Sequence, residues 1–380
     1  MWAPEIPIST IEGDSNRRRW LWTLKDAPVT IANYECVVRD KDVIAEPDMV
    51  FDLCVIDEAQ RIKNRDGNTA HVIRSIQRRR SWALTGTPVE NCAEDLVGIF
   101  EYLAPGYLCP KMKPRQLGQL AGEFVIRRTK EYVLTDMPPK LYRDADIDLT
   151  PAQLESYRMA EDEGIVRLNE MGNEVNIQNV FELVLRLKQI CNFDPVTGDS
   201  AKLERLESDL EEVAASGKQA IVFSQWVHTL ERIAERLKRF NPLQYHGRIP
   251  SKQRAGIIDR FKQNKKHSVL LLSYGAGGVG LNIQFASYVF LFDRWWNPAL
   301  EDQAINRAHR IGAVGPVTVT RFLIVDTIEQ RIDQVLTDKR QLFDTILNSA
   351  EPQRNLGLSK AQVFSLFKLK GPGGAIDVAA

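Results

Sequence analysis

Two arginines in the last third of the chain are spaced for phosphate chemistry. Arg307 and Arg310 follow the apolar run 288–292, which predicts a buried strand, and Pro298 with the acids after it marks the start of a helix. Side chains three residues apart project from one face of a helix, so both guanidiniums could grip one polyanion, and a triphosphate is the obvious candidate. The spacing alone is equally compatible with solvated arginines on a surface helix.

Two carboxylates have the complementary chemistry. Asp57 and Glu58 come directly after the apolar run 50–56, which predicts a second buried strand. In open α/β sheets, ligands bind at the carboxyl ends of the strands. One carboxylate could hold Mg²⁺ on nucleotide phosphates while its neighbour orients or deprotonates an attacking water. An isolated Asp-Glu pair is a weak signal, because any strand can simply run into a polar loop.

The elements that must position these groups alternate between strand and helix. Short apolar runs predict strands at 27–33, 50–56, 81–84, 219–223, 243–245, 269–272, 288–292 and 317–323. Apolar residues at helical spacing predict helices at 178–192, 201–215, 224–240 and 251–262. This alternation predicts an α/β fold with parallel sheets covered by helices on both faces. The opening before residue 27 shows no period, and its arginine run 17–19 is expected to be a solvated face or a DNA contact.

Composition sets broad limits. A chain of 380 residues predicts two or three domains. Lys+Arg and Asp+Glu both number 50, so net charge neither supports nor excludes a nucleic-acid partner. Five cysteines without a C-x-x-C pair argue against a zinc site or disulfide framework and favour a reducing cytoplasm. The sequence contains no stretch that predicts a membrane span and no signal-peptide core, so no membrane partner is expected.

Six segments together carry a specific resemblance. They are DEAQRIKN at 57–64, LTGTPVEN at 84–91, SQW at 224–226, YHG at 245–247, SYGAGGVGLN at 273–282 and the segment 288–312 that contains RWWNP and NRAHRIG. In combination they resemble motifs II to VI of the Swi/Snf-type DNA translocases, a branch of the superfamily-two helicase-like ATPases. The resemblance runs from Met1 to about Leu369. Tyr274, Gly275 and Ala313 depart from the family pattern, which usually has Lys or Thr, Ala, and Gln there.

The resemblance implies two RecA-like lobes, the cofactors ATP and Mg²⁺, and double-stranded DNA as partner. It implies that Asp57 coordinates Mg²⁺ through water, that Glu58 is the catalytic acid, and that Arg307 and Arg310 are arginine fingers. The implied ATP-binding residues are Gln60, Gly278, Gly280, Arg307 and Arg310. The implied DNA-binding residues are Thr85, Asn91, Ser224, Gln225, His246, Arg254, Asn282, Arg294 and Trp295.

The family's phosphate-binding loop, G-x-x-x-x-G-K-[ST], does not occur in this sequence, and the resemblance starts just before motif Ib at 31–36. We therefore expect a partial, N-terminally incomplete first lobe at 1–145, with an exposed sheet edge and part of its core uncovered. A second lobe with a helical lead-in is expected at 146–345, and a brace helix with a flexible tail at 346–380.

Two hypotheses follow. In the first, the protein is an ATP-dependent DNA translocase, either because this chain is an excerpt or because the missing lobe portion is supplied in trans. In the second, it is a catalytically inactive, truncated remnant that at most binds DNA or a protein partner. Without the phosphate-binding loop, residues 1–380 alone are expected to show no DNA-stimulated ATPase activity. The compact spacing between motifs III and IV favours a bacterial or archaeal type, and hence a cytoplasmic, nucleoid-associated location if bacterial.

Overall fold

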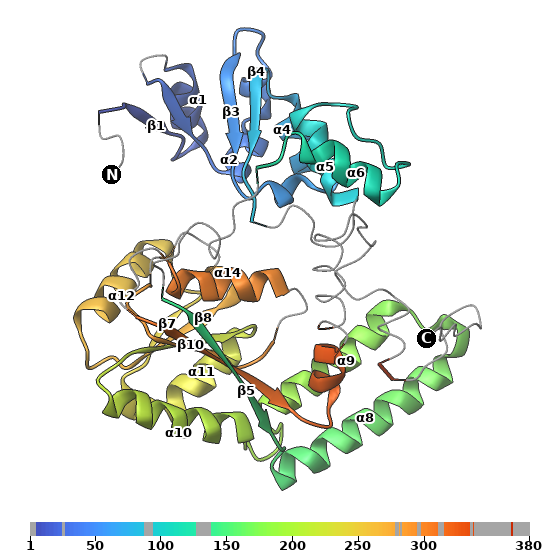
Figure 1. Ribbon diagram of the computed structural model, residues 1–380, viewed down its shortest axis with the longest axis vertical. Helices are drawn as coiled ribbons and strands as arrows, with labels where there is room; N and C mark the ends of the chain where they lie inside the picture. The colour runs from blue at the N-terminus through green and yellow to red at the C-terminus, as the bar shows by residue number, and fades with distance from the viewer. Residues whose placement is uncertain are drawn as a thin grey trace. The chain divides into compact units, whose positions relative to one another are not determined.

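The computed structural model describes residues 5–24, 27–86, 94–126, 138–277, 281, 283–294, 298–310, 315–334, 337 and 366–367 (Figure 1). The chain divides into two compact units, residues 1–126 with 342–356 and residues 127–341 with 357–380. The boundary predicted at residue 145 falls inside strand β5, Lys140–Ile147, which pairs with the last strand of the second unit.

The first unit contains two small parallel sheets, β1 with β2 and β3 with β4. Its strands are β1 (Ile8–Thr10), β2 (Val29–Ile31), β3 (Phe51–Ile56) and β4 (Arg78–Ala83). Its helices are α1 (Ser15–Thr23), α2 (Tyr34–Arg39), α3 (Lys41–Ile44), η1 (Ala59–Ile62), α4 (Asn68–Ser75), α5 (Glu94–Leu103) and α6 (Pro114–Gly122). β2, β3 and β4 lie where the apolar runs predict strands, because those runs are flanked by polar and turn-forming residues.

The β3–β4 sheet is covered on one face only. Cys54 and Ile56 face a core that includes Ile62 and Tyr102. On the opposite face, Val55 lies beside Trp82, and these side chains remain 46% and 59% exposed. A parallel sheet normally has helices on both faces. Among the described residues, no helix therefore covers the Val55–Trp82 face of this sheet.

Helix α1 corrects the expectation of an irregular opening. Asp14 caps the helix by accepting a hydrogen bond from the Arg17 main-chain N–H. Arg18 and Trp22 turn inward, and both donate hydrogen bonds to the carboxylate of Asp40. The middle arginine of the basic run is thus a structural partner of Asp40. Sequence periodicity could not show this, because the partner lies 22 residues away.

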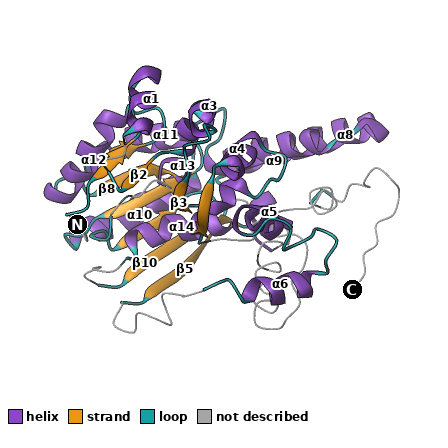
Figure 2. Ribbon diagram, turned by 90° about the horizontal axis from the view of Figure 1, so that it is seen from above, coloured by secondary structure: helices purple, strands orange, loops and turns teal. Residues whose placement is uncertain are grey.

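The second unit is built on a six-stranded parallel sheet with the order β5-β10-β9-β6-β8-β7. After β5 come α8 (Pro151–Met171), η2 (Gly172–Glu174), α9 (Ile177–Asn192), α10 (Ala201–Ala215), β6 (Ala220–Ser224), α11 (Val227–Arg236), η3 (Lys238–Phe240), β7 (Leu243–Tyr245), α12 (Ser251–Gln263), β8 (Val269–Ser273), α13 (Tyr274–Gly277), β9 (Tyr288–Leu291), α14 (Pro298–Ala308) and β10 (Val317–Ile324). The predicted α/β class with a helix-covered parallel sheet is confirmed. Figure 2 shows the edge strand β5 beside β10, with helices around the sheet.

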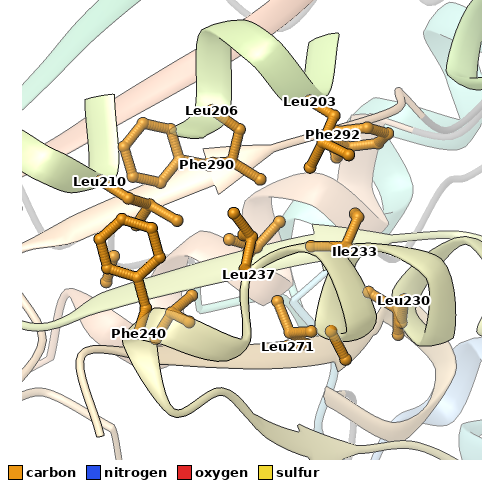
Figure 3. Packing of buried hydrophobic residues seen from close by; sticks show 14 of the residues in the cluster. Leu203, Leu206, Leu210, Leu230, Ile233, Leu237, Phe240, Leu271, Phe290 and Phe292 are labelled. Carbon is orange, nitrogen blue, oxygen red and sulfur yellow. The ribbon is translucent and has the colours of Figure 1, made fainter. Parts of the chain in front are cut away.

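Both faces of this sheet are packed, because alternate residues of its central strands are apolar in both directions. On one face, α10 and α11 contribute the cluster drawn in Figure 3, in which Leu206 and Ile233 pack with Leu271 and Phe290 of the strands. On the other face, residues of α12 and α14 pack against Ile221, Leu270 and Val289. The sheet therefore holds its carboxyl-end loops on a rigid base.

Helices α8 and α9 form a second core beside the sheet. Thr150 caps α8, with Pro151 at its first position. This core also contains Leu366 and Phe367. Apart from those two residues, the predicted brace helix and tail lie outside the described residues.

Candidate functional site

The two predicted catalytic acids lie in the turn that follows β3. Glu58 has φ 51° and ψ 51°, a left-handed backbone conformation that a non-glycine residue adopts at a cost of about 1–2 kcal/mol. The Asp57 side chain supports this turn by accepting the Glu58 main-chain N–H at 2.9 Å. Asp57 itself is exposed, so its carboxylate faces solvent at the carboxyl end of the strand.

Hydrogen bonds join this turn to the end of the neighbouring strand. Gln60 donates from Nε2 to Glu58 Oε2 at 2.8 Å, and Thr85 Oγ1 donates to Gln60 Oε1 at 2.7 Å. The strands support the same arrangement, since Leu84 N donates to the carbonyl of Ile56 at 2.8 Å. The structure thus brings together three predicted site residues. The amide side chain of Gln60 bridges Thr85 and Glu58.

Tyr34 is a site residue that the sequence analysis missed. Its hydroxyl donates to the main-chain carbonyl of Asp57 at 2.7 Å. The Arg61 guanidinium lies 4.5 Å from the centre of the Tyr34 ring, and its pairing with Glu35 holds it there. Burial raises the pKa of Tyr34 to about 12, which keeps the hydroxyl protonated as a donor. Its place in the IANYEC segment was the only signal.

The carboxylates fit magnesium that arrives with a nucleotide. Mg²⁺ prefers oxygen ligands and is usually held by one or two carboxylates together with water and substrate phosphates. Asp57 and Glu58 supply such oxygens. Within the described ranges, no cluster of three or more His, Cys, Asp or Glu side chains could hold a metal ion by itself.

In the second unit, the carboxyl ends of β6, β8 and β9 meet at Asp293. Ser224 donates from Oγ and Gln225 donates from its main-chain N–H, at 2.8 Å, to the Asp293 carboxylate. Asn192 Nδ2 donates to the same carboxylate at 3.1 Å. Tyr274 donates from its hydroxyl to the Asp293 carbonyl at 2.9 Å. Sequence reasoning assigned Asp293 to a loop and missed this role.

Several residues implied to contact DNA point into the protein. Ser224 is 0% exposed, because its hydroxyl is turned onto Asp293. His246 is also buried, and burial lowers its pKa below the ordinary value. Arg254 donates to the carbonyls of Ile249 and Gly247 at 2.7 and 2.9 Å, which shapes the loop after β7.

Arg294 is held in the same way. It is buried and pairs with Glu301 at 3.1 Å and with Asp333. These carboxylates raise the pKa of Arg294 above its ordinary value in spite of its burial. Arg294 therefore ties the loop after β9 to α14 and to the helical residues 328–334. Gln225 is partly exposed at the same sheet edge.

Arg307 and Arg310 do not lie in one helix. Arg307 lies in the last turn of α14 and is partly exposed. The helix ends at Ala308, so Arg310 lies two residues beyond it and is exposed. This corrects the predicted common helical face. The neighbouring His309 has its Nε2 2.5 Å from the carbonyl of Pro138, a tertiary contact that the local spacing cannot reveal.

The remaining predicted site residues, Asn91, Gly278, Gly280, Asn282 and Trp295, lie outside the described residues. In the part of the chain that the structure covers, no helix combines the length and apolar character needed to cross a membrane.

Comparisons with known proteins define the class. The SNF2-related domain matches residues 1–195, and the helicase conserved C-terminal domain matches residues 201–312. Because the first match covers more than half of the chain, the chain belongs to the SNF2-related family, as the sequence motifs predict.

The chain is similar over most of its length to bacterial proteins of this kind. It is 31% identical to an uncharacterized ATP-dependent helicase of Mycoplasma pneumoniae, covering 91% of this chain and 35% of that protein. It is 31% identical to a putative ATP-dependent helicase/translocase of Bacillus subtilis, covering 86% of this chain and 38% of that protein. The chain thus spans about a third of the length of these relatives.

Among solved structures, the chain is similar to the SWI2/SNF2 ATPase core of Sulfolobus solfataricus in complex with dsDNA. The two are 28% identical, with 97% of this chain and 82% of that chain covered and a TM-score of 0.49.

Proposed function

We propose that the protein is an ATP-dependent translocase that couples ATP hydrolysis to movement on duplex DNA. The observation that supports the proposal is the hydrogen-bonded series Thr85–Gln60–Glu58, which links the ends of two strands to the carboxylate proposed to be catalytic. A translocase needs such a link, because its contacts with DNA must alter the rate at which it hydrolyses the nucleotide. The ATP-dependent relatives named above support the same activity.

The first unit would supply the acid chemistry. Asp57, exposed at the strand end, would hold Mg²⁺ through water, and Mg²⁺ when bound neutralises charge on the nucleotide phosphates. Glu58 would orient or deprotonate the attacking water, with Gln60 fixing the direction of its carboxylate. Tyr34 would hold the main chain of Asp57 in place.

The second unit would supply positive charge. Arg307 and Arg310 would stabilise the charge that develops on the transferred phosphate, and Gly278 with Gly280 would let the main chain approach the nucleotide. Arg310 is the more accessible arginine, because it lies exposed beyond the end of α14.

DNA would be held mainly through its phosphates, with little sequence reading. Gln225, Asn91, Asn282, Trp295 and Thr85 are proposed contacts. The loops that present such contacts would be shaped by the buried residues Ser224, His246 and Arg294, and by Arg254, which donates to carbonyls of the loop after β7.

A second function is favoured by a specific observation. The phosphate-binding loop does not occur among the 380 residues, so this polypeptide by itself lacks the lysine that holds the phosphates. The apolar face of the β3–β4 sheet is also uncovered. A catalytically inactive protein that binds DNA or a protein partner is therefore the alternative.

DNA-stimulated ATP hydrolysis separates the two functions. The polypeptide alone is expected to give no turnover above that of its Glu58→Gln variant. An assembly that adds a G-x-x-x-x-G-K-[ST] segment, in the same chain or in trans, is expected to hydrolyse ATP when duplex DNA is present and to lose this activity with Glu58→Gln. Hydrolysis by that assembly that ignores DNA, or that survives Glu58→Gln, would contradict the translocase proposal.

A further inference from the structure

The buried carboxylate of Asp293 stands among charges drawn from segments about 100 residues away in sequence. Asp293 is 0% exposed, and so is Lys202 of α10. Lys202 Nζ donates to Asn192 Oδ1 at 3.1 Å and to Glu329 Oε1 at 2.6 Å. Because Asn192 also donates to Asp293, an unbroken chain of hydrogen bonds runs from Asp293 to Glu329.

A second buried lysine reaches the same place. Lys188 of α9 donates from Nζ to the carbonyl of Arg294 at 2.6 Å, one residue beyond Asp293. Lys188 and Lys202 together balance the charges of Asp293 and Glu329. A buried set of this kind is tolerated only when its charges are paired and its polar atoms are bonded. The arrangement therefore fixes the positions of the main-chain segments that carry it.

The identity of the Asp293 side chain matters because every group aimed at it is a donor. Ser224 O–H, Gln225 N–H and Asn192 Nδ2–H all converge on its two oxygens. An ionised carboxylate accepts at both oxygens, whereas an asparagine must present an NH₂ group in place of one of them. Replacing Asp293 by Asn would therefore set a donor against a donor even though size and shape are kept.

Tyr274 extends this set to a third strand. The ring of Tyr274 stacks on Phe223 of β6 with centroids 5.5 Å apart, and its hydroxyl reaches the Asp293 carbonyl. Tyr274, which departs from the family pattern, is thus buried, and its side chain joins the end of β8 to the loop after β9.

We propose that Asp293 is a positioning residue that holds the segments following β6, β8 and β9 in one arrangement, with Lys188, Lys202 and Asn192 as its support. The proposal deepens the proposed function and rests on it, since these segments are the ones expected to present groups to DNA and nucleotide. Asp293 acts through Gln225 and Ser224 and touches neither ligand.

The test uses the full chain and four variants. Asp293→Asn replaces one of the two acceptor oxygens by an NH₂ group and leaves one excess positive charge, whereas Asp293→Asn with Lys188→Met restores the charge balance without restoring the second acceptor oxygen. Ser224→Ala removes the hydroxyl that donates to Asp293 and accepts from the Trp226 main-chain N–H, and it guards against misfolding of the other two. Asp259→Asn, at an exposed position on α12 of the same unit, is the matched control. Hydrogen exchange of the Gln225 amide, thermal unfolding and anisotropy of a labelled duplex are measured for each.

The charge-balanced double variant is expected to unfold at a temperature closer to wild type than Asp293→Asn does. Both variants are nevertheless expected to exchange the Gln225 amide roughly tenfold faster and to bind duplex DNA roughly tenfold more weakly, the effect of one lost buried hydrogen bond. Ser224→Ala should show smaller changes in the same direction, and Asp259→Asn none.

Unchanged exchange of the Gln225 amide in both Asp293 variants would overturn the proposal. So would a double variant that regains wild-type DNA affinity together with its stability, because a merely structural role predicts that result. If wild-type protein fails to bind duplex DNA, the proposed function fails, and the exchange measurement still decides whether Asp293 positions the segment after β6.

Discussion

Lys202→Met tests how much the second unit depends on its buried charges. Lys202 and Glu329 are 0% and 4% exposed, and their ion pair has an N–O distance of 2.6 Å. Methionine keeps most of the side-chain volume, so the substitution leaves Glu329 buried without its partner and Asn192 without a donor. Breaking a buried pair from one side costs about 3–5 kcal/mol, so the free energy of unfolding should fall by about that amount.

The assay is hydrogen exchange of the β6 and β8 amides at increasing urea concentration, because these central strands open only when the sheet unfolds. Lys202→Met with Glu329→Gln removes both charges and should recover a large part of the loss. Lys238→Met is the matched control. Lys238 pairs with Glu235 at the surface, with both side chains at least 75% exposed, so its loss should cost no more than about 1 kcal/mol.

Equal effects of Lys202→Met and Lys238→Met would refute this reasoning, since burial is the property from which the larger cost of Lys202→Met is predicted. A double variant that is less stable than Lys202→Met would also refute it, because the excess charge would then not be the source of the loss.

Two further predictions concern packing and pH. Gly98→Ala should destabilise the first unit by about 1–3 kcal/mol in urea unfolding, because its Cβ would collide with the main-chain carbonyl of Lys63, whereas Gly118→Ala, which meets no described atom within 4 Å, should be neutral or slightly stabilising. A stable Gly98→Ala protein would contradict that contact. Burial lowers the pKa of His246 from 6.5, so the unfolded chain binds more protons below that pH and stability should fall as pH drops from 6.5 towards the native pKa. His246→Gln should flatten this pH dependence of the unfolding free energy by up to about 1.4 kcal/mol per pH unit, and an unchanged slope would show that His246 is not protected from protonation.

Most of the second unit could be predicted from sequence because its strands are continuously apolar. The run 269–272 is buried on both faces of the sheet, so its apolar residues predict a strand without knowledge of its neighbours. β5 was missed because it is an edge strand whose sequence, KLYRDADI, is charged and largely exposed. Its place in the sheet depends on pairing with β10, more than 170 residues further on.

The sequence predicted which residues of the candidate site lie at strand ends. It did not predict the direction in which their side chains point. Glu58 and Thr85 follow neighbouring strands, so their connection through Gln60 follows from topology. Whether Ser224 and Arg294 face solvent or the interior does not follow from their positions after a strand. It is decided by Asp293 and Glu301, whose pairing with them is a tertiary contact. Motif resemblance identifies such residues, but it does not distinguish a residue that contacts a ligand from one that supports a loop.

The most direct test of the central claim is duplex DNA binding by this chain as a function of salt. Anisotropy of a labelled duplex should report binding that is indifferent to base sequence and that weakens by orders of magnitude between roughly 50 and 200 mM salt, as expected when lysines and arginines replace counterions along the phosphates. No binding at the lower salt concentration, or binding that depends on base sequence and not on salt, would contradict the account.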